Sequence, residues 1–124
     1  MGLEFDNHRP IYIQIMEYIY SGISRGDMSP GSKLLSVREF AVEAGVNPNT
    51  VSRTYMEMER EGVVVSKRGQ GTFVTEDTAV IETLRRDIAA KQVDTFLDTM
   101  HNLGIDDKTI LNLMKERMDD AKED

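Results

Sequence analysis

The side chains best suited to chemistry fall into two short stretches, one polar and one basic. The polar stretch, residues 47–53, reads NPNTVSR and carries groups that hydrogen-bond to phosphates and base edges. The basic stretch, residues 67–71, reads KRGQG and combines two cations with glycines that let a backbone approach a partner closely. Both patterns are typical of nucleic-acid binding. The candidate DNA-binding residues are Arg38, Asn47, Asn49, Thr50, Ser52, Arg53, Lys67, Arg68, Gly69, Gln70 and Gly71.

Catalytic and metal chemistry has no comparable set of residues. The chain has no cysteine, which removes disulfides, thiolate zinc sites, iron–sulfur clusters and cysteine nucleophiles together. His8 and His101 lie far apart and lack a ligand partner at helical spacing, so no metal site is expected, and the acids at 119–124 stay open only as weak cation ligands. KRGQG lacks the lysine–serine/threonine ending of a nucleotide-binding loop. We therefore expect neither an enzyme nor a cofactor.

The position of the charges changes the meaning of their sum. The 124 residues include 15 basic and 22 acidic side chains, a net charge of −7, which by itself argues against a nucleic-acid partner. Residues 1–75 carry only −1 of this charge, whereas residues 76–124 carry −6. The interval 33–75 is locally +1. The acidic part is therefore expected to suppress nonspecific DNA binding, while the first part remains able to bind DNA.

The length and the hydrophobic pattern indicate one small domain with an appendage. The pattern changes near Glu76, from mixed helix and strand signals to helix alone, which predicts a domain over 1–75 and a helical tail over 76–124. The N-terminus lacks the basic start and apolar run of a signal peptide, and no stretch approaches the roughly 18–20 apolar residues of a membrane helix. A cytoplasmic protein is expected, with no membrane partner.

Three helices are predicted in the first part, each with its own start and stop signals. The first begins near Pro10, which suits a first helical turn, and ends before the turn formers at 26–31. The second begins with a capping box between Ser36 and Glu39. The third follows a break at 44–46, begins at Asn47 and Pro48, and ends at Gly62.

The two short helices and the residues after them form a recognisable layout. Two helices joined by a tight glycine-containing turn predict a helix-turn-helix, whose second helix enters the DNA major groove. Two β-prone runs, 63–66 and 72–75, flank the basic glycine-rich stretch and predict a hairpin with this stretch at its tip. The fold class is therefore α+β, mainly α, with a winged helix-turn-helix at the N-terminus.

The second part is predicted to form two helices, 77–102 and 106–121, whose apolar side chains make one stripe. This stripe exceeds what two helices bury against each other, which favours a homodimer over a ligand site. The candidate dimerisation residues are Ile81, Leu84, Ile88, Phe96, Leu97, Met100, Leu103, Ile110, Leu111, Met114 and Met118.

The segments PIYIQI, GDMSPGSKLLSVREFA, GVNPNTVSRTYMEMEREG and KRGQGTFV, in this order, resemble the DNA-binding domain of the GntR family of bacterial transcriptional regulators. The resemblance covers residues 8–75. The 49 residues after it resemble the short YtrA-type subgroup, whose two C-terminal helices make the dimer. The chain differs from the family pattern at Leu35, where the family usually has proline. Without this proline, the loop before Arg38 would be less rigid.

The resemblance implies a homodimeric regulator, most often a repressor, that reads a pseudo-palindromic double-stranded DNA operator. It implies DNA contacts from Arg38, from the start of the third helix and from the hairpin tip, and target operons that include membrane transporters. An effector, if one exists, is expected at the dimer interface or between the winged helix and the tail. The alternative is a winged helix that serves protein contacts, which would have no need for a basic hairpin tip and a polar third helix.

Overall fold

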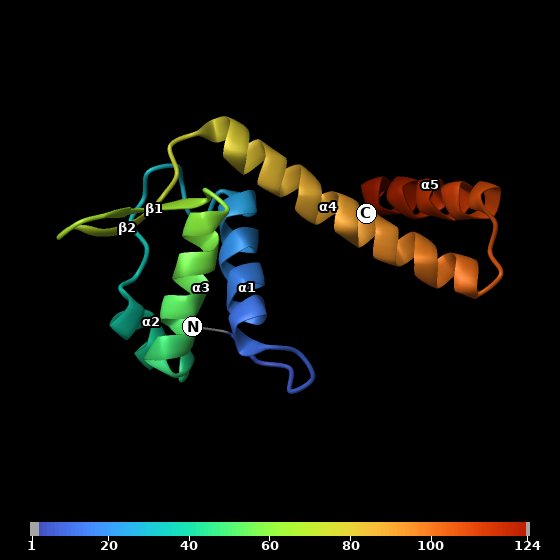
Figure 1. The fold of residues 1–124 in the computed structure, drawn as a ribbon. Helices are drawn as coiled ribbons and strands as arrows, with labels where there is room; N and C mark the ends of the chain where they lie inside the picture. Colours follow the sequence, from blue (N-terminus) through green and yellow to red (C-terminus); the bar gives the residue numbers. More distant parts are fainter. Residues whose placement is uncertain (1–2, 124) are drawn as a thin grey trace. The chain divides into compact units, whose positions relative to one another are not determined.

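The computed structural model describes residues 3–123, which contain five α-helices and a two-stranded sheet (Figure 1). The chain divides into two compact units, Met1–Arg86 and Asp87–Asp124, with the boundary inside α4. The predicted fold class is confirmed as mainly helical with a small winged sheet. The elements are α1 (Ile11–Arg25), α2 (Val37–Ala44), α3 (Pro48–Arg60), β1 (Val64–Lys67), β2 (Gly71–Val74), α4 (Thr78–Asn102) and α5 (Asp107–Glu123).

The core of the first unit lies where α1 packs against α3, and Figure 1 shows α3 between α1 and α2. Ile15 and Ile19 of α1 and Val51 and Met58 of α3 are at most 1% exposed. Thr54 is also fully buried, and its hydroxyl donates to the carbonyl of Thr50 at 2.8 Å, so burial leaves no unpaired polar group there. The buried face of α3 leaves its opposite side available for a partner.

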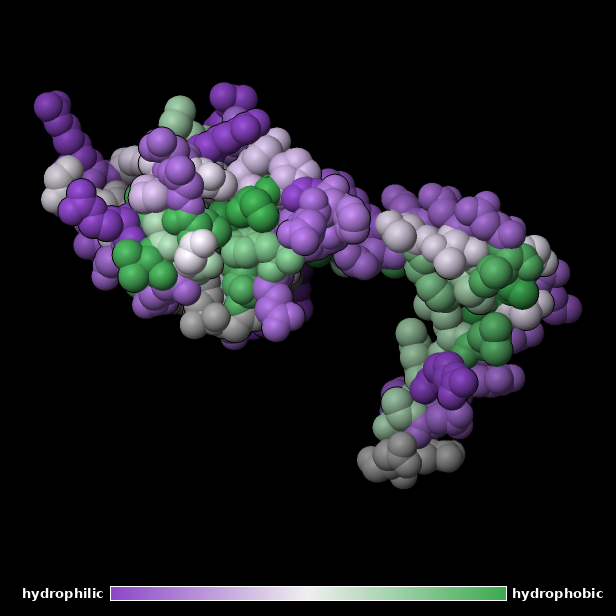
Figure 2. Space-filling model, turned by 90° about the horizontal axis from the view of Figure 1, so that it is seen from below, coloured by the Kyte–Doolittle hydropathy of each residue, from purple (hydrophilic) through white to green (hydrophobic). Residues whose placement is uncertain are grey.

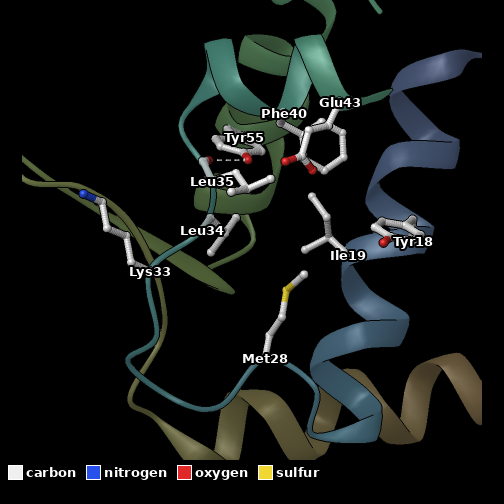
Figure 3. Close-up of a pocket in the computed structure, with 9 residues that line it drawn as sticks. All are labelled: Tyr18, Ile19, Met28, Lys33, Leu34, Leu35, Phe40, Glu43 and Tyr55. Atoms are coloured by element: carbon white, nitrogen blue, oxygen red, sulfur yellow. Dashed lines mark hydrogen bonds between the residues drawn. The ribbon is translucent and has the colours of Figure 1, made fainter. Parts of the chain in front are cut away.

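Aromatic contacts hold α2 against the other two helices. The Phe40 ring stands edge-on to Tyr18 of α1, with ring centroids 6.5 Å apart, and to Tyr55 of α3 at 6.3 Å. The Tyr55 hydroxyl donates a 2.7 Å hydrogen bond to the carbonyl of Leu35, just before α2 (Figure 3). The entry into α2 is therefore tied to α3 although Leu35 replaces the usual proline.

The helix ends follow the local sequence signals. The Ser36 hydroxyl accepts from the amide of Glu39 at 3.1 Å, and the Glu39 carboxylate accepts from the amide of Ser36 at 3.1 Å, which confirms the capping box. The Asn47 side chain caps α3 by accepting from the amide of Asn49 at 2.8 Å. Gly45 ends α2 with φ of 68°, in the left-handed region. α1 begins next to Pro10 as predicted, although Pro10 occupies the N-cap position, with no side-chain capping hydrogen bond, and lies just before the first turn.

The wing sheet contains more backbone pairing than the sequence suggested. β1 and β2 pair antiparallel, and Lys67 and Gly71 are the last pair of the ladder, so the tip is 68–70 and not the whole of 67–71 as predicted. Residues 31–34, here called the edge segment, pair with the other side of β2 through a bridge between Lys33 and Phe73. The amide of Leu34 donates to the carbonyl of Thr72 at 2.8 Å. The turn formers before this segment predict a loop here, and the pairing with β2 is a difference from that prediction.

The helices of the second unit form a hairpin around a turn in which Gly104 has φ of 80°. His101 Nε2 lies 2.6 Å from Asp107 Oδ1 across this turn. Ile110 is buried at 2% exposure, so part of the predicted dimerisation set packs within the hairpin itself.

The predicted single stripe along α4 is wrong. Each residue of an α-helix is rotated by about 100° from the one before it, so Ile81, Leu84 and Ile88 share one side of α4. The later apolar residues of the predicted set are centred roughly 120° around the helix axis from that side, and they are Phe96, Leu97, Met100 and Leu103. α4 accordingly contains no fully buried residue. The helix therefore has two short apolar faces in place of one long one.

Replacing Tyr55 with phenylalanine tests the link between α3 and the entry to α2. Tyr55→Phe keeps the ring but removes the donor to Leu35, so the free energy of unfolding should fall by about 1 kcal/mol, measured by urea denaturation. Tyr18→Phe is the matched control, since within residues 3–123 the Tyr18 hydroxyl makes no hydrogen bond. Equal losses in both variants would contradict the assigned role.

Candidate nucleic-acid interface

The first turns of α3 present a polar surface on the side away from the core. Asn49 and Arg53 are exposed, Thr50 and Ser52 are half-buried, and Val51 between them is fully buried. Asn47 is exposed, but its side-chain oxygen is engaged in capping the helix. The exposed amide and hydroxyl groups match the donors and acceptors that read base edges in a major groove.

Arg53 lies against an aromatic ring of α1. Its guanidinium carbon lies 3.9 Å from the centroid of the Tyr12 ring on α1, a cation–π contact. Tyr12 is half-buried, and its place in the apolar spacing of α1 gave no sign of this contact. The ring restricts Arg53 to one region of the polar surface.

Arg38 and the wing tip supply further charge near this surface. Arg38 is exposed in the first turn of α2, next to the capping box. Arg68, Gly69 and Gln70 are exposed at the tip, where Gly69 has φ of 75°, a backbone conformation that favours glycine. Figure 1 shows the hairpin projecting beyond the helices of the first unit.

The basic residues of 1–75 divide into two groups by their partners. Arg9, Arg25 and Arg60 each form an ion pair with a carboxylate. The other five make no ion pair within the described residues, and they are Lys33, Arg38, Arg53, Lys67 and Arg68. Four of these five are predicted DNA contacts. A cation without a carboxylate partner keeps its charge available for phosphates.

Hydrogen bonding and burial shift the pKa of three groups around α2 and α3. The amide and hydroxyl of Ser36 lower the pKa of Glu39, with a smaller contribution from the charge of Lys33. Burial raises the pKa of the Tyr55 hydroxyl, which therefore stays protonated and donates to Leu35. Burial and a hydrogen bond to Glu61 raise the pKa of Tyr20. These bonds stabilise the elements that carry the polar surface.

Several residues predicted for dimerisation are exposed on the second unit, where Figure 2 shows hydrophobic side chains gathered on one face. Leu103 is 70% exposed, Leu111 67% and Met118 57%. Leu113, which the prediction omitted, is 41% exposed. Phe96 is also exposed. Apart from the buried Ile110, the other predicted dimerisation residues are half-buried, and they are Ile81, Leu84, Ile88, Leu97, Met100 and Met114.

Two features are absent from the described part of the chain, a membrane-spanning helix and a cluster of metal-ligating side chains. Among residues 3–123, no helix has the length and apolar character needed to cross a bilayer. The same residues contain no group of three histidine or acidic side chains arranged to hold a metal ion.

Comparison with known sequences identifies relatives over the winged helix and beyond it. The profile described as "Bacterial regulatory proteins, gntR family" matches residues 11–74. The chain is 40% identical to the uncharacterized HTH-type transcriptional regulator YhcF of Bacillus subtilis (strain 168), over 93% of this chain and 95% of that protein. It is 36% identical to the HTH-type transcriptional repressor YtrA of the same organism, over 91% of this chain and 88% of that protein.

Solved structures agree with these relatives. A GntR family transcriptional regulator from Listeria monocytogenes superposes with a TM-score of 0.85 at 42% identity, over 90% of this chain and 98% of that one. The structure of AraR(DBD) in complex with operator ORR3 matches with a TM-score of 0.53 at 32% identity, over 60% of this chain and 88% of that one.

The capping box makes part of the stability depend on pH. Because the folded-state pKa of Glu39 is lowered from its usual 4.5, its contribution is present above that value and lost as the pH falls through the lowered pKa. Glu39→Gln keeps an acceptor but does not titrate, so it should lose less stability than the wild type over this interval. Urea denaturation at each pH measures both proteins.

Glu43→Gln, which removes the same charge from the same helix outside the capping box, serves as the control. It should lose stability on acidification as steeply as the wild type. If Glu39→Gln also followed the wild type, the capping box would not contribute to the acid dependence.

Proposed function

Since the chain belongs to the GntR family of bacterial regulatory proteins, we propose that it represses transcription by binding a pseudo-palindromic operator as a homodimer. Membership of this family makes the chain a transcription regulator and not an enzyme. The YtrA relative is named as a repressor, and the AraR(DBD) structure contains operator DNA. These two findings support repression through operator binding.

The observation that carries the proposal is the unpaired charge around the polar end of α3. We assign the reading of bases to Asn49, Thr50 and Ser52, with α3 lying in the major groove. Arg38 and Arg53 bind phosphates on either side of this helix. The wing at 67–71 supplies positive charge and close backbone approach to the neighbouring groove.

The domain division assigns one task to each part of the chain. Residues 1–75 bind DNA, and residues 76–124 join two copies through their exposed apolar side chains. Two-fold symmetry then places the two α3 helices in major grooves about 34–36 Å apart, or a multiple of this spacing. The dimer would act in the cytoplasm, where a bacterial operator is reached, with a transporter operon among its targets.

Removing two unpaired arginines should weaken DNA binding without unfolding the protein. We expect Arg38→Ala combined with Arg53→Ala to weaken binding to every duplex and to reduce the slope of log affinity against log salt by about 0.9 per arginine, because each variant chain loses two phosphate contacts. Binding to a duplex from the region upstream of the gene is measured by fluorescence anisotropy across a salt series, and circular dichroism reports the fold.

Arg25→Ala combined with Arg60→Ala is the charge-matched control, since both of these arginines are already paired with carboxylates. This variant should retain most of the affinity. The proposed function fails if the wild type binds no upstream DNA, or if its binding does not weaken as salt increases.

An acidic residue on the hairpin should disrupt the proposed dimer. Leu111→Asp places a charge at a 67% exposed apolar position, so analytical ultracentrifugation should show the mass of one chain where the wild type shows two. Val42→Asp, at a 78% exposed position on α2, is the control and should remain dimeric. A monomeric wild type would refute the homodimer.

A further inference from the structure

Among the cations of the winged helix that make no ion pair within residues 3–123, Lys33 is the one that the predicted contact set leaves out. It lies in the edge segment and is paired through the backbone bridge with Phe73 of β2. Its side chain runs across the wing at Gly71, so closely that a Cβ on this glycine would lie 2.8 Å from Lys33 Cε. The aliphatic stem of Lys33 thus occupies the space over Gly71 that a larger residue at this position would fill.

The wing has one core face and one outward face, and Lys33 belongs to the outward one. Paired residues of neighbouring strands point to the same face of a sheet, and faces alternate along each strand. Val64 and Val74 are 1% exposed and form the core face. Lys33, Phe73 and Lys67 therefore share the other face, where Lys67 Nζ lies 4.7 Å from the centroid of the Phe73 ring. Two lysines therefore lie on the face that carries the Phe73 ring, and the ammonium group of one of them, Lys67, lies over that ring.

Neither ammonium group is neutralised by the protein. The ion pairs found within residues 3–123 include neither Lys33 nor Lys67. The acid whose pKa responds to Lys33 is Glu39, and its carboxylate is engaged by the amide of Ser36. The charge of Lys33 is therefore available to an external anion.

The position of Lys33 links the two predicted parts of the interface. Two residues separate it from Ser36, the N-cap of α2, and its bridge partner belongs to the wing. Figure 3 shows the Lys33 side chain extending away from the cavity of about 280 Å³ that the labelled residues line, with its amino end pointing along the wing strands. An anion bound there would lie between the start of α2 and the wing.

We propose that Lys33, with Lys67 beside it, binds a backbone phosphate of the DNA strand that passes between α2 and the wing. The contact rests on the proposed function, and it adds a phosphate site to the predicted contacts of α2, α3 and the wing tip. A phosphate contact positions the protein on DNA but carries no sequence information. Lys33 therefore contributes equally to binding of any DNA sequence.

The experiment compares two variants of the full chain. Lys33→Met keeps an unbranched stem across Gly71 and removes the charge, and Lys33→Arg restores a charge. Lys91→Met removes the same charge from an exposed position on α4 and controls for the change in net charge. Affinities are measured across a salt series on an upstream duplex and on an unrelated duplex of equal length.

We expect Lys33→Met to reduce the slope of log affinity against log salt by about 0.9 per chain, because one phosphate contact is lost. The fold-loss of affinity should be the same on both duplexes. Lys33→Arg should restore the slope, and Lys91→Met should leave it unchanged. The urea midpoint of each variant shows whether the wing remains folded.

The outcomes separate this proposal from the proposed function. If the wild type binds with a normal salt slope and Lys33→Met has the same slope, the Lys33 contact is refuted while the regulator stands. A loss confined to the upstream duplex also refutes it, because that result indicates base reading. Salt-independent or absent binding by the wild type refutes the regulator itself.

Discussion

The hydrogen bond from Tyr55 to the carbonyl of Leu35 is the constraint on which the DNA-binding surface depends. A buried tyrosine hydroxyl requires a partner, and Tyr55 finds it on the segment that leads into α2. The same ring packs edge-on against Phe40 of α2. One residue of α3 therefore fixes both the start and the packing of α2, and with them the position of Arg38. Proline at residue 35 is not needed for this restraint.

The arrangement of charge explains how an acidic chain has a surface suited to DNA. Most of the excess acid lies in residues 76–124, and three of the eight basic residues in 1–75 are paired with carboxylates. The other five lie on α2, α3, the edge segment and the wing. Net charge describes long-range attraction, whereas the unpaired groups decide where an anion binds. The acidic total and the basic surface are therefore compatible.

The parts of the fold that the sequence predicts are those with local causes. The Ser36 capping box, the Asn47 cap and the left-handed Gly45 each depend on residues a few positions apart. The hairpin and the family resemblance were predicted in the same way, and the profile match confirms the family. The bridge from Lys33 and the stacking of Arg53 on Tyr12 join distant segments, so no local pattern reports them. The two faces of α4 are hidden in a pattern of three- and four-residue spacings, because such spacings leave the cumulative helical angle over about seven turns unspecified.

The small number of unpaired cations is the reason why the proposed function needs two copies of the chain. Within residues 3–123, five cations per copy make no ion pair, and the base reading that we propose for α3 uses amide and hydroxyl groups rather than arginines. Joining two copies doubles both sets of contacts without adding any charge to the individual surface. It also makes the second binding event intramolecular, which raises affinity sharply when the half-sites have the right spacing. In the proposed homodimer, the exposed leucines of the α4 and α5 hairpin would provide the selectivity that a weakly basic surface lacks, because unrelated DNA rarely offers two half-sites together.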